Sequence, residues 1–389
     1  MAQQLTIRQI AELAGVSVGT VDRVLHNRGR VSPEALAAVQ AVLDKQSYKY
    51  NLHTSAVAFR RTGKSFHIVI SIPSSEKGEY WDLIRDGFEK AFQEYSDISI
   101  QSQYVFFDQY SSISCREAFR SIESIPCSAV ILCTNFVEET VELCANLDSR
   151  KIPYVFVDGM VSKTRPIANF MVDQTRCGRL LAHLMDRLTP PGSEKAVFLP
   201  RRVGNQMSNN STIRLASFKA YFEEKGESGL IREVQFSADD PELTRTEVSA
   251  FLSTNPGIRG IAVVTSVGYR VSDALPASIA PSAAGFPSAP GAALAPGSPS
   301  ALGSPSVPGS ALASGTGAHC GICVGGFDVT EGNARCVREG TLEFLIDQHP
   351  QRQGFCAVES LLHHLLYGVP DPSLPSSLPI DIVFRENLA

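Results

Sequence analysis

Hydrophobic residues in the first 46 positions recur three or four residues apart, which is the spacing of one helix face. The first group is Ile7, Ile10, Ala11 and Ala14, the second is Val21, Val24 and Leu25, and the third is Leu36, Val39, Val42 and Leu43. Thr6 and Ser17 precede the first two groups as helix caps, and Gly15 stands where the chain can turn sharply. The pattern predicts two short helices within residues 5–32 and a third helix over residues 34–46.

From residue 66 onward, short apolar runs alternate with longer amphipathic stretches. We expect strands at 66–72, 98–107, 129–133, 154–157, 168–172, 196–199, 230–236, 260–264 and 320–325, and helices at 80–95, 114–125, 138–147, 175–188, 212–225, 241–253 and 268–275. Strands that alternate with helices predict doubly wound parallel sheets. Because two such sets follow one another, we expect an α/β domain of two lobes with a ligand cleft at the carboxyl ends of the strands.

One segment fits neither pattern. Residues 276–318 consist almost entirely of Ala, Pro, Gly and Ser, with no charged residue and a single aromatic, Phe286. Such a composition cannot bury enough apolar surface to order itself. We predict a disordered insertion within the second lobe, and inert filler is the simplest interpretation of it because a longer surface loop costs little closure entropy.

The first two helices form a helix-turn-helix, the unit that places its second helix in a DNA major groove. From Thr6 the sequence follows T-I-x-x-I-A-x-x-A-G-V-S-x-x-T-V-x-R-V-L without a gap, and Val31-Ser32 follows. This stretch resembles the headpiece of the lactose-repressor (LacI/GalR) family of transcription regulators. The resemblance implies a DNA-binding headpiece over residues 1–50 and a hinge over residues 51–64, for which a plain linker is the alternative.

The resemblance also implies which headpiece residues meet DNA. Val18, Gly19 and Arg23 would face base edges, and Arg23 suits guanine because a guanidinium can donate to both O6 and N7. A second set is suited to phosphates, which position the protein but do not specify sequence: Thr6, Arg8, Ser17, Thr20, Asn27 and Ser32. In the hinge, Asn51 fits the family pattern and Val57 takes the place of the residue that wedges into the minor groove.

Residues 66–388 resemble the type I periplasmic-binding-protein fold, which the same family carries behind its headpiece. The likeness is densest at Gly326-Phe327-Asp328 and at the I-D-Q-H-P run that contains Gln348. It implies a sensor with a first lobe at 65–162 and 330–365 and a second lobe at 163–329 and 366–389. The implied ligand is sugar-like. Motif position suggests Asp173, Arg214, Asp328 and Gln348 as effector contacts, and position after a strand suggests Tyr80, Trp81, Asn135 and Asp158.

The charge is unevenly distributed along the chain. The whole sequence has a formal net charge of −5, but residues 1–64 hold nine Lys and Arg against four Asp and Glu. A basic N-terminal segment in an otherwise acidic chain is typical of a DNA-binding domain. Since one headpiece buries little surface, we expect a homodimer on a pseudo-palindromic operator in double-stranded DNA.

The sequence lacks the common catalytic motifs and the apolar segments of signal peptides and membrane spans. The nine cysteines are scattered, which favours reduced thiols, and the lone pair Cys320 and Cys323 has no partner pair for zinc. We therefore expect a cytoplasmic regulator, most simply a repressor, that is not an enzyme and needs no metal, cofactor or membrane. A solute-binding protein without a DNA role is the alternative, followed by an enzyme on the same scaffold.

Overall fold

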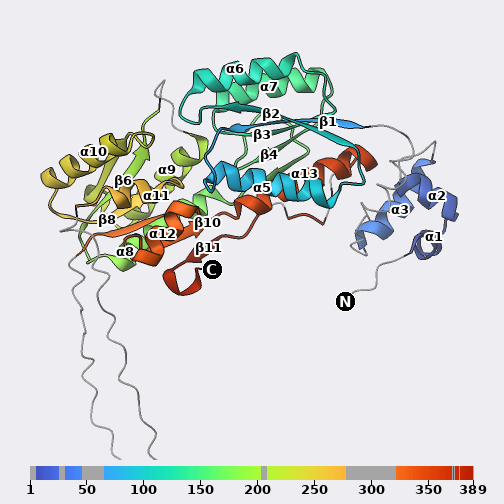
Figure 1. Ribbon diagram of the computed structural model, residues 1–389. Helices are drawn as coiled ribbons and strands as arrows, with labels where there is room; N and C mark the ends of the chain where they lie inside the picture. The colour runs from blue at the N-terminus through green and yellow to red at the C-terminus, as the bar shows by residue number, and fades with distance from the viewer. Residues whose placement is uncertain are drawn as a thin grey trace, which may run out of the picture.

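The computed structural model describes residues 6–25, 31–45, 65–202, 208–276, 321–369, 371, 373–375 and 377–388 (Figure 1). It comprises a small helical headpiece and a sensor domain of two α/β lobes. The predicted hinge, including Asn51 and Val57, lies outside the described residues, as do Asn27 and all but the first residue of the predicted insertion at 276–318.

The headpiece consists of α1 (Ile7–Ala14), α2 (Val18–Leu25) and α3 (Pro33–Lys45). Thr6 caps α1, because its hydroxyl accepts a hydrogen bond from the backbone N–H of Gln9 and the Gln9 side chain bonds back to Thr6. Gly15 ends α1 with φ of 65°, a left-handed conformation that glycine adopts without strain. The three helices enclose a core of Ile10, Ala11, Val21 and Val39. The predicted helix-turn-helix is therefore formed.

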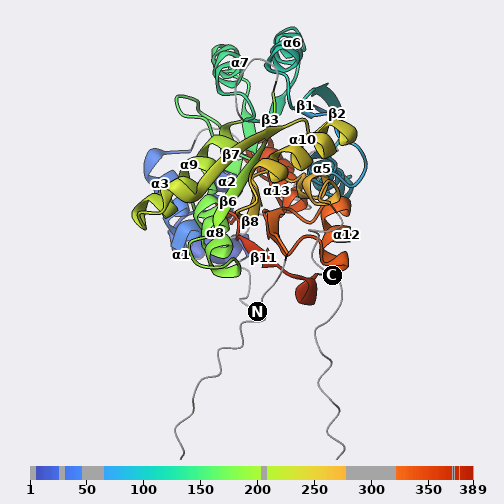
Figure 2. The ribbon, with the colours of Figure 1, turned by 90° about the vertical axis from the view of Figure 1, so that its left-hand side faces the viewer.

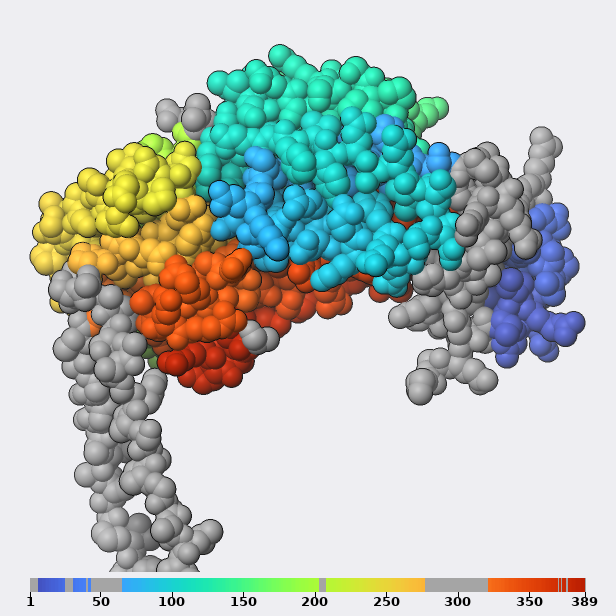
Figure 3. Space-filling view, in the orientation of Figure 1, coloured from blue at the N-terminus to red at the C-terminus, as the bar shows by residue number. Residues whose placement is uncertain are grey.

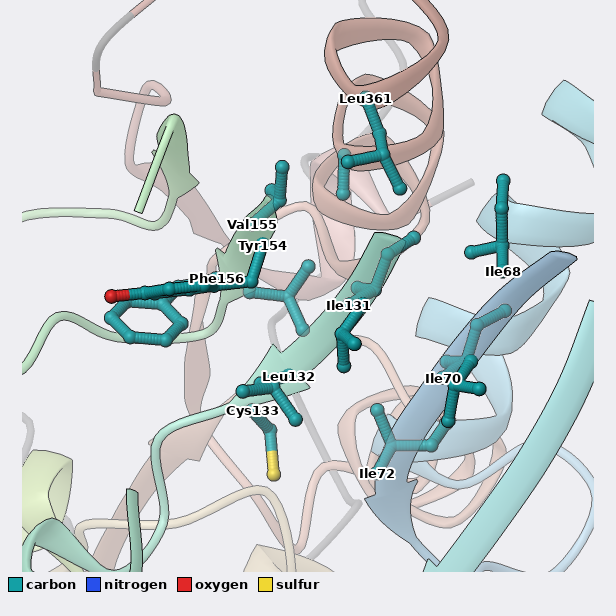
Figure 4. Packing of buried hydrophobic residues seen from close by; sticks show 14 of the residues in the cluster. Ile68, Ile70, Ile72, Ile131, Leu132, Cys133, Tyr154, Val155, Phe156 and Leu361 are labelled. Atoms are coloured by element: carbon teal, nitrogen blue, oxygen red, sulfur yellow. The ribbon is translucent and has the colours of Figure 1, made fainter. Parts of the chain in front are cut away.

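The first lobe of the sensor is built on a five-stranded parallel sheet with the order β2-β1-β3-β4-β5. Its strands are β1 (Phe66–Pro73), β2 (Ile100–Phe107), β3 (Ala129–Cys133), β4 (Tyr154–Val157) and β5 (Ala168–Phe170). Helices α6 (Ser112–Glu123) and α7 (Val137–Ser149) cover one face, and α5 (Tyr80–Glu94) and α13 (Pro350–Tyr367) cover the other (Figure 1). The apolar core lies between these layers (Figure 4).

The central strands β3 and β4 are hydrophobic on both faces because helices cover both, whereas the edge strand β2 exposes Gln101, Ser102 and Gln103. Ile68, Ile70 and Ile72 of β1 lie beside Ile131 of β3 in the packing view, and Leu361 of α13 approaches the sheet from the helix layer (Figure 4). All of these side chains are fully buried or nearly so. This is why β3 and β4 are uninterrupted apolar runs in the sequence rather than alternating ones.

The second lobe holds a six-stranded sheet with the order β11-β10-β9-β8-β6-β7, in which only the β10–β11 pair is antiparallel. Its strands are β6 (Glu194–Pro200), β7 (Ile231–Phe236), β8 (Ile258–Val263), β9 (Cys323–Phe327), β10 (Phe344–Asp347) and β11 (Asp381–Val383). Its helices are α8 (Gln174–Leu188), α9 (Asn209–Glu224), α10 (Pro241–Thr254), α11 (Gly268–Asp273) and α12 (Glu331–Glu339), with single 3₁₀ turns at Ser228–Leu230 and Arg385–Asn387.

Helices cover both faces of this sheet as well. Figure 2 shows α8 and α9 on one side of β6 and β8, with α10 and α12 on the other. Alternate residues of β6 supply the two faces: Ala196 and Phe198 belong to one apolar cluster, and Val197 and Leu199 to the other. The prediction of doubly wound sheets in two lobes is confirmed.

The lobe boundaries differ from the predicted ones in two places. Strand β5 pairs with β4, so the first lobe continues past residue 162, where we had ended it. Strand β10 pairs with β9 and α12 packs on α11, so residues 331–347 belong to the second lobe and not to the first. The chain returns to the first lobe only at α13. The physical reason is that β9, α12 and β10 form one strand–helix–strand unit, whose two strands must share a sheet.

Candidate functional site

A cavity of about 260 Å³ lies between the two lobes. Its walls come from the carboxyl ends of strands in both sheets, as expected for open α/β sheets. In the first lobe, Ser74 follows β1, Gln109 follows β2, Asn135 follows β3 and Asp158 follows β4. In the second lobe, the corresponding positions are Arg202 after β6, Ser266 after β8 and Gln348 after β10. In the space-filling view, the second lobe lies against the first along this boundary, with α12 in orange beside α5 in light blue (Figure 3).

Asp158 is the buried carboxylate on the first-lobe side of the cavity. It adopts φ of 70° directly after β4 and is 6% exposed. The Tyr80 hydroxyl donates to its Oδ1 at 2.6 Å, and the Asn210 side chain, from the second lobe, donates to its Oδ2 at 2.8 Å. Burial raises the pKa of Asp158, and the nearby Arg214 opposes that shift. The carboxylate therefore joins groups from both lobes at one point.

Arg214 projects from α9 into the centre of a second group of polar side chains and is 3% exposed. Its guanidinium donates to Gln174 Oε1 at 2.7 Å, to the carbonyl of Val264 at 2.8 Å and to Gln348 Oε1. It also lies over the ring of Phe327, 4.0 Å from the centroid. Planar donors in fixed positions can read hydroxyl or carboxylate oxygens at the cavity wall.

Close packing of α8 on α9 holds Arg214 in place. A Cβ built on Gly178 of α8 would lie 2.9 Å from the Cα of Arg214 and closer still to its carbonyl oxygen. Real Cβ atoms do not approach so closely, so only glycine permits this distance between the helices. The position of the guanidinium thus depends on a residue that does not touch the cavity.

Asp328 does not line the cavity, but it hydrogen-bonds to the polar side chains around Arg214. It is fully buried, with φ of 62° after β9, and accepts hydrogen bonds from Gln348 Nε2 at 2.7 Å and from the Ser266 hydroxyl at 2.6 Å. Burial, together with the neighbouring Asp347, raises the pKa of Asp328 to about 7. Asp328 thereby orients Gln348, whose side-chain amide reaches both Arg214 and the cavity.

Aromatic side chains form the remaining walls. Tyr80 and Trp81 meet edge to face with ring centroids 5.1 Å apart, and the Trp81 indole donates to Gln109 Oε1 at 3.1 Å. On the side of the second lobe, the Tyr269 hydroxyl donates to Glu79 Oε1 at 2.8 Å. That bond crosses between the lobes, and burial raises the pKa of Glu79. Ring faces of this kind suit the apolar side of a sugar.

The predicted effector residues can now be placed. Six of them line the cavity: Tyr80, Trp81, Asn135, Asp158, Arg214 and Gln348. Asp328 lies directly behind it, bonded to Gln348. The structure contradicts the choice of Asp173, which caps α8 by accepting from the Arg176 N–H at 3.0 Å and keeps its side chain 45% exposed. The next residue, Gln174, is the one that points inward and joins Arg214 to Gln348.

In the headpiece, the residues predicted to read bases lie on α2. Val18 is 47% exposed, although it is apolar, and Gly19 and Arg23 are also exposed. The Arg23 side chain donates to the carbonyl of Gly19 at 3.0 Å, one turn earlier in the helix. Val18 and Gly19 therefore lie in the first turn of α2 and Arg23 in its last turn, all on the helix that a helix-turn-helix places in the major groove.

Apart from Asn27, which lies outside the described residues, the residues predicted to contact phosphates are also at the surface or close to it. Ser17 and Thr20 join their hydroxyls at 2.8 Å, and the Ser17 hydroxyl accepts from the Thr20 N–H at 3.1 Å. Ser32 caps α3 through the N–H of Ala35 at 3.2 Å, and Thr6 and Arg8 are exposed. The hydroxyls of Thr6, Ser17 and Ser32 therefore each cap a helix.

Comparison with known proteins identifies both parts of the chain. Residues 6–51 match the family described as bacterial regulatory proteins, lacI family. Residues 68–368 match the periplasmic binding protein domain, which covers most of the chain. The chain belongs to the lacI family of bacterial regulatory proteins. The family is one of DNA-binding transcription regulators, and this lacI-family chain carries both its helix-turn-helix domain and its two-lobed α/β domain.

Curated relatives agree with this assignment. The chain is 24% identical over 242 residues to the HTH-type transcriptional regulator DegA of Bacillus subtilis, an alignment that covers 60% of this chain and 66% of DegA. It is 25% identical over 268 residues to the ribose operon repressor of Halalkalibacterium halodurans, which covers 66% of this chain and 70% of the relative. The matched region thus spans about two thirds of each relative.

Solved structures share the fold. A putative LacI transcriptional regulator from Bacteroides fragilis superposes with a TM-score of 0.68 at 22% identity, over 83% of this chain and 98% of that one. A solute-binding protein from Burkholderia graminis in complex with D-arabinose superposes with a TM-score of 0.61 at 14% identity, over 83% of this chain and 96% of that one. At these identities the likeness is one of fold.

Several residues that line the cavity of this lacI-family chain were not predicted from the sequence. They are Gln109, Tyr110, Arg202, Asn210, Tyr269 and Arg270. A signal was present for some of them, because Gln109, Tyr110 and Arg202 come within three residues of a strand's carboxyl end. In the sequence, Arg201 and Arg202 look like a pair of solvent-exposed arginines. Asn210 is buried because α9 meets the first lobe, which the sequence does not show.

Within the described ranges, no group of three or more His, Cys, Asp or Glu side chains is arranged to hold a metal ion. In the same ranges, no helix has both the length and the apolar character needed to span a bilayer. Cys323 is partly buried, and burial raises the pKa of its thiol. Its predicted partner, Cys320, lies outside the described residues.

Proposed function

We propose that a small polyhydroxylated molecule of monosaccharide size binds in the cavity and controls the affinity of this regulator for its operator. One observation carries the proposal. Asp158 of the first lobe and Asn210, Arg214 and Gln348 of the second form a buried polar wall at which both lobes supply hydrogen-bonding groups. A ligand that contacts this wall must contact both lobes.

The chemistry of the walls favours a sugar or a sugar derivative. Carboxylate, amide and guanidinium groups suit hydroxyls, and the rings of Tyr80 and Trp81 suit an apolar sugar face. The volume of about 260 Å³ is below the range of about 300–1,000 Å³ that is typical of drug-sized ligands, so one ring fits better than two. The ribose operon repressor and the arabinose-bound solute-binding protein among the similar proteins support the same class.

Coupling to DNA requires that the ligand favour one arrangement of the lobes over another. The bonds that cross between the lobes give it a means to do so, since Asn210 bonds to Asp158 and Tyr269 bonds to Glu79. A ligand that strengthens or replaces these bonds shifts the population toward the arrangement it fits. The simplest biological outcome is a repressor that works in the cytoplasm and whose operator is released or bound when the cavity fills.

On the DNA side, we propose that α2 enters the major groove. Arg23 donates to a guanine, Val18 contacts a thymine methyl group, and Gly19 allows close backbone approach. Thr6, Arg8, Ser17, Thr20 and Ser32 are suited to phosphates, as is Asn27 by family position. In the hinge, Asn51 fits the family pattern and Val57 takes the place of the residue that wedges into the minor groove. A single module buries only about 600–1,000 Å², so two headpieces of a homodimer bind a pseudo-palindromic operator.

The test has two arms that use the full-length protein. Selection from random double-stranded DNA first yields an operator, and its affinity is measured for the wild type, Arg23→Ala and the control Arg165→Ala, which removes an exposed arginine of the sensor domain. We expect Arg23→Ala alone to weaken binding, by about 5- to 150-fold for a lost bidentate base contact. Unchanged affinity in Arg23→Ala would contradict the DNA arm.

In the second arm, sugars, sugar acids, sugar phosphates and polyols are screened by thermal shift. A ligand at 100 times its dissociation constant adds about 2.7 kcal/mol to the free energy of unfolding, and each hit is then tested for its effect on operator affinity. A ligand that binds without altering operator affinity would favour the solute-binding alternative. Turnover of a bound compound would favour the enzyme alternative.

A further inference from the structure

Arg202 is a charged group of the cavity for which the protein supplies no opposite charge in contact. It follows β6 and lines the cavity, partly buried. Its guanidinium donates to the main-chain carbonyl of Gln109 and lies over the rings of Tyr110 and Phe136, 5.5 Å and 5.4 Å from their centroids. These groups hold the guanidinium in place but do not neutralise it.

No carboxylate within the described residues forms an ion pair with Arg202, whereas its neighbour Arg201 pairs with Glu247 at 2.8 Å. Asp108 and Asp158 act on it electrostatically without forming an ion pair, and burial lowers the pKa of the guanidinium. The sequence outside the described residues contains no Asp or Glu. A desolvated cation without a partner is costly, so a counter-charge from a ligand would be strongly favoured there.

Most of the other charged side chains of the cavity have partners or an opposite charge nearby. Arg214 interacts electrostatically with Asp158 and Asp328. Its guanidinium donates hydrogen bonds to the side chains of Gln174 and Gln348 and to a main-chain carbonyl. Glu79 accepts from Tyr269 and interacts electrostatically with Arg270. The Arg270 guanidinium lies over the Tyr269 ring, 5.0 Å from its centroid, and although its Nε is buried without a hydrogen-bond partner, the cation has the charge of Glu79 nearby. Asp239 is exposed at the rim. Of the cavity's charged side chains, Arg202 is therefore the one best placed to meet an anion, with donors available in a planar fork.

We infer that the effector is an anionic monosaccharide, a sugar acid or a sugar phosphate, whose negative group binds at Arg202. The sugar hydroxyls then meet the polar groups of Asp158 and Asn210. This inference rests on the proposed function, because it names the chemical class of the ligand in the same cavity. It is narrower than that function, since a neutral sugar would satisfy the proposed function and still contradict the inference.

The experiment measures the affinity of the full-length protein for matched pairs of compounds by calorimetry. The anionic members are gluconate, glucuronate, galacturonate, glucose 6-phosphate and ribose 5-phosphate, and the neutral members are glucose, galactose and ribose. We expect an anionic member to bind at least 10-fold more tightly than its neutral counterpart, and to bind more weakly as salt rises. The carboxylates and the phosphates in the panel distinguish the two sources of the charge.

Two variants locate the contact. Arg202→Gln should weaken the anionic ligand by about 10- to 100-fold, as expected for a hydrogen bond to a charged group, while it changes a neutral sugar by less than about 3-fold. Arg201→Gln is the matched control, because it loses a surface ion pair with no cavity contact, and it should leave both affinities unchanged. An unchanged unfolding temperature shows that each variant is folded.

Three results would overturn the inference. A neutral sugar that binds as tightly as its anionic partner would overturn the inference of an anionic ligand, but it would leave the proposed function intact. Glucosamine is the probe for a cationic sugar. If it binds more tightly than the anionic and the neutral compounds, the cavity prefers a positive charge and the inference is wrong. Absence of binding by every compound in the panel would overturn the sugar assignment under the proposed function as well.

Discussion

The headpiece and the cavity differ in how far apart along the chain their residues lie. The helix-turn-helix uses contiguous residues, from the Thr6 cap to Arg23 on α2, and its interior is small: Ile10, Ala11, Val21 and Val39. The cavity draws on side chains as far apart as Ser74 and Gln348, brought together by two sheets. The headpiece surface is therefore specified locally, whereas the cavity exists only when both lobes are folded and in contact.

The largest effect is expected from a substitution that unfolds the headpiece alone. Ile10→Ala removes a fully buried side chain and should cost about 2–5 kcal/mol, which is a large share of the stability that so small a domain has. We expect operator binding to be lost while the unfolding temperature of the sensor and its ligand affinity stay unchanged. Ligand affinity that falls together with operator binding would show that the two regions do not fold independently.

A second change acts on the contact between the lobes. Asn210→Ala removes the hydrogen bonds from its side chain to the Asp158 carboxylate and carbonyl. Because one acceptor is charged, we expect a loss of about 10- to 100-fold in effector affinity. Asn209→Ala, which removes a bond to Met160 O outside the cavity wall, is the control. Equal losses in both variants would mean that lobe contact in general, and not the Asp158 wall, determines affinity.

The packing beneath the cavity offers a third test. Gly178→Ala places a methyl group against the backbone of Arg214, and overpacking of this kind costs about 1–3 kcal/mol. We expect a lower unfolding temperature and a weaker effector response, because α9 must shift and carry Arg214 with it. Gly229→Ala, where an added Cβ meets no other atom, should change neither quantity. A full effector response in Gly178→Ala would show that the guanidinium tolerates displacement.

The smallest effect concerns a helix cap. Thr6→Ala removes the hydroxyl that accepts from the Gln9 N–H, and the loss of such a cap costs about 1 kcal/mol. Thr6→Ser keeps the hydroxyl and serves as the control. We expect modest weakening of operator binding by Thr6→Ala at any operator sequence, since a cap and a phosphate contact carry no base preference. Altered sequence preference would instead assign Thr6 a role in base reading.

The elements could be predicted where local pattern determines them. The strands at Ala129–Cys133 and Tyr154–Val157 match their predicted bounds, because short apolar runs flanked by polar residues leave little choice of register. The lobe to which α12 and β10 belong could not be predicted, because strand order in a sheet depends on pairing between distant segments. No residue between Val329 and Pro350 marks the point where the chain changes lobes.

The cavity was predicted only in part, for the same reason. Residues that end a strand, such as Asn135 and Asp158, could be proposed from position alone. Asp173 and Gln174 could not be told apart, because which of two neighbouring residues caps α8 and which points inward depends on the helix start. Arg202 was missed because its partners, Tyr110 and Phe136, come from the other lobe.

Ligand binding in the cavity and operator binding by the headpiece are coupled in this proposal, and coupling between two binding sites is reciprocal. If the effector changes operator affinity by some factor, then operator DNA must change effector affinity by the same factor, which is about 5- to 150-fold in typical allosteric proteins. The measurement is calorimetry of the effector with the full-length protein, in the absence and the presence of saturating operator. We predict two effector affinities that differ by that factor. Equal effector affinities with and without the operator would contradict the account.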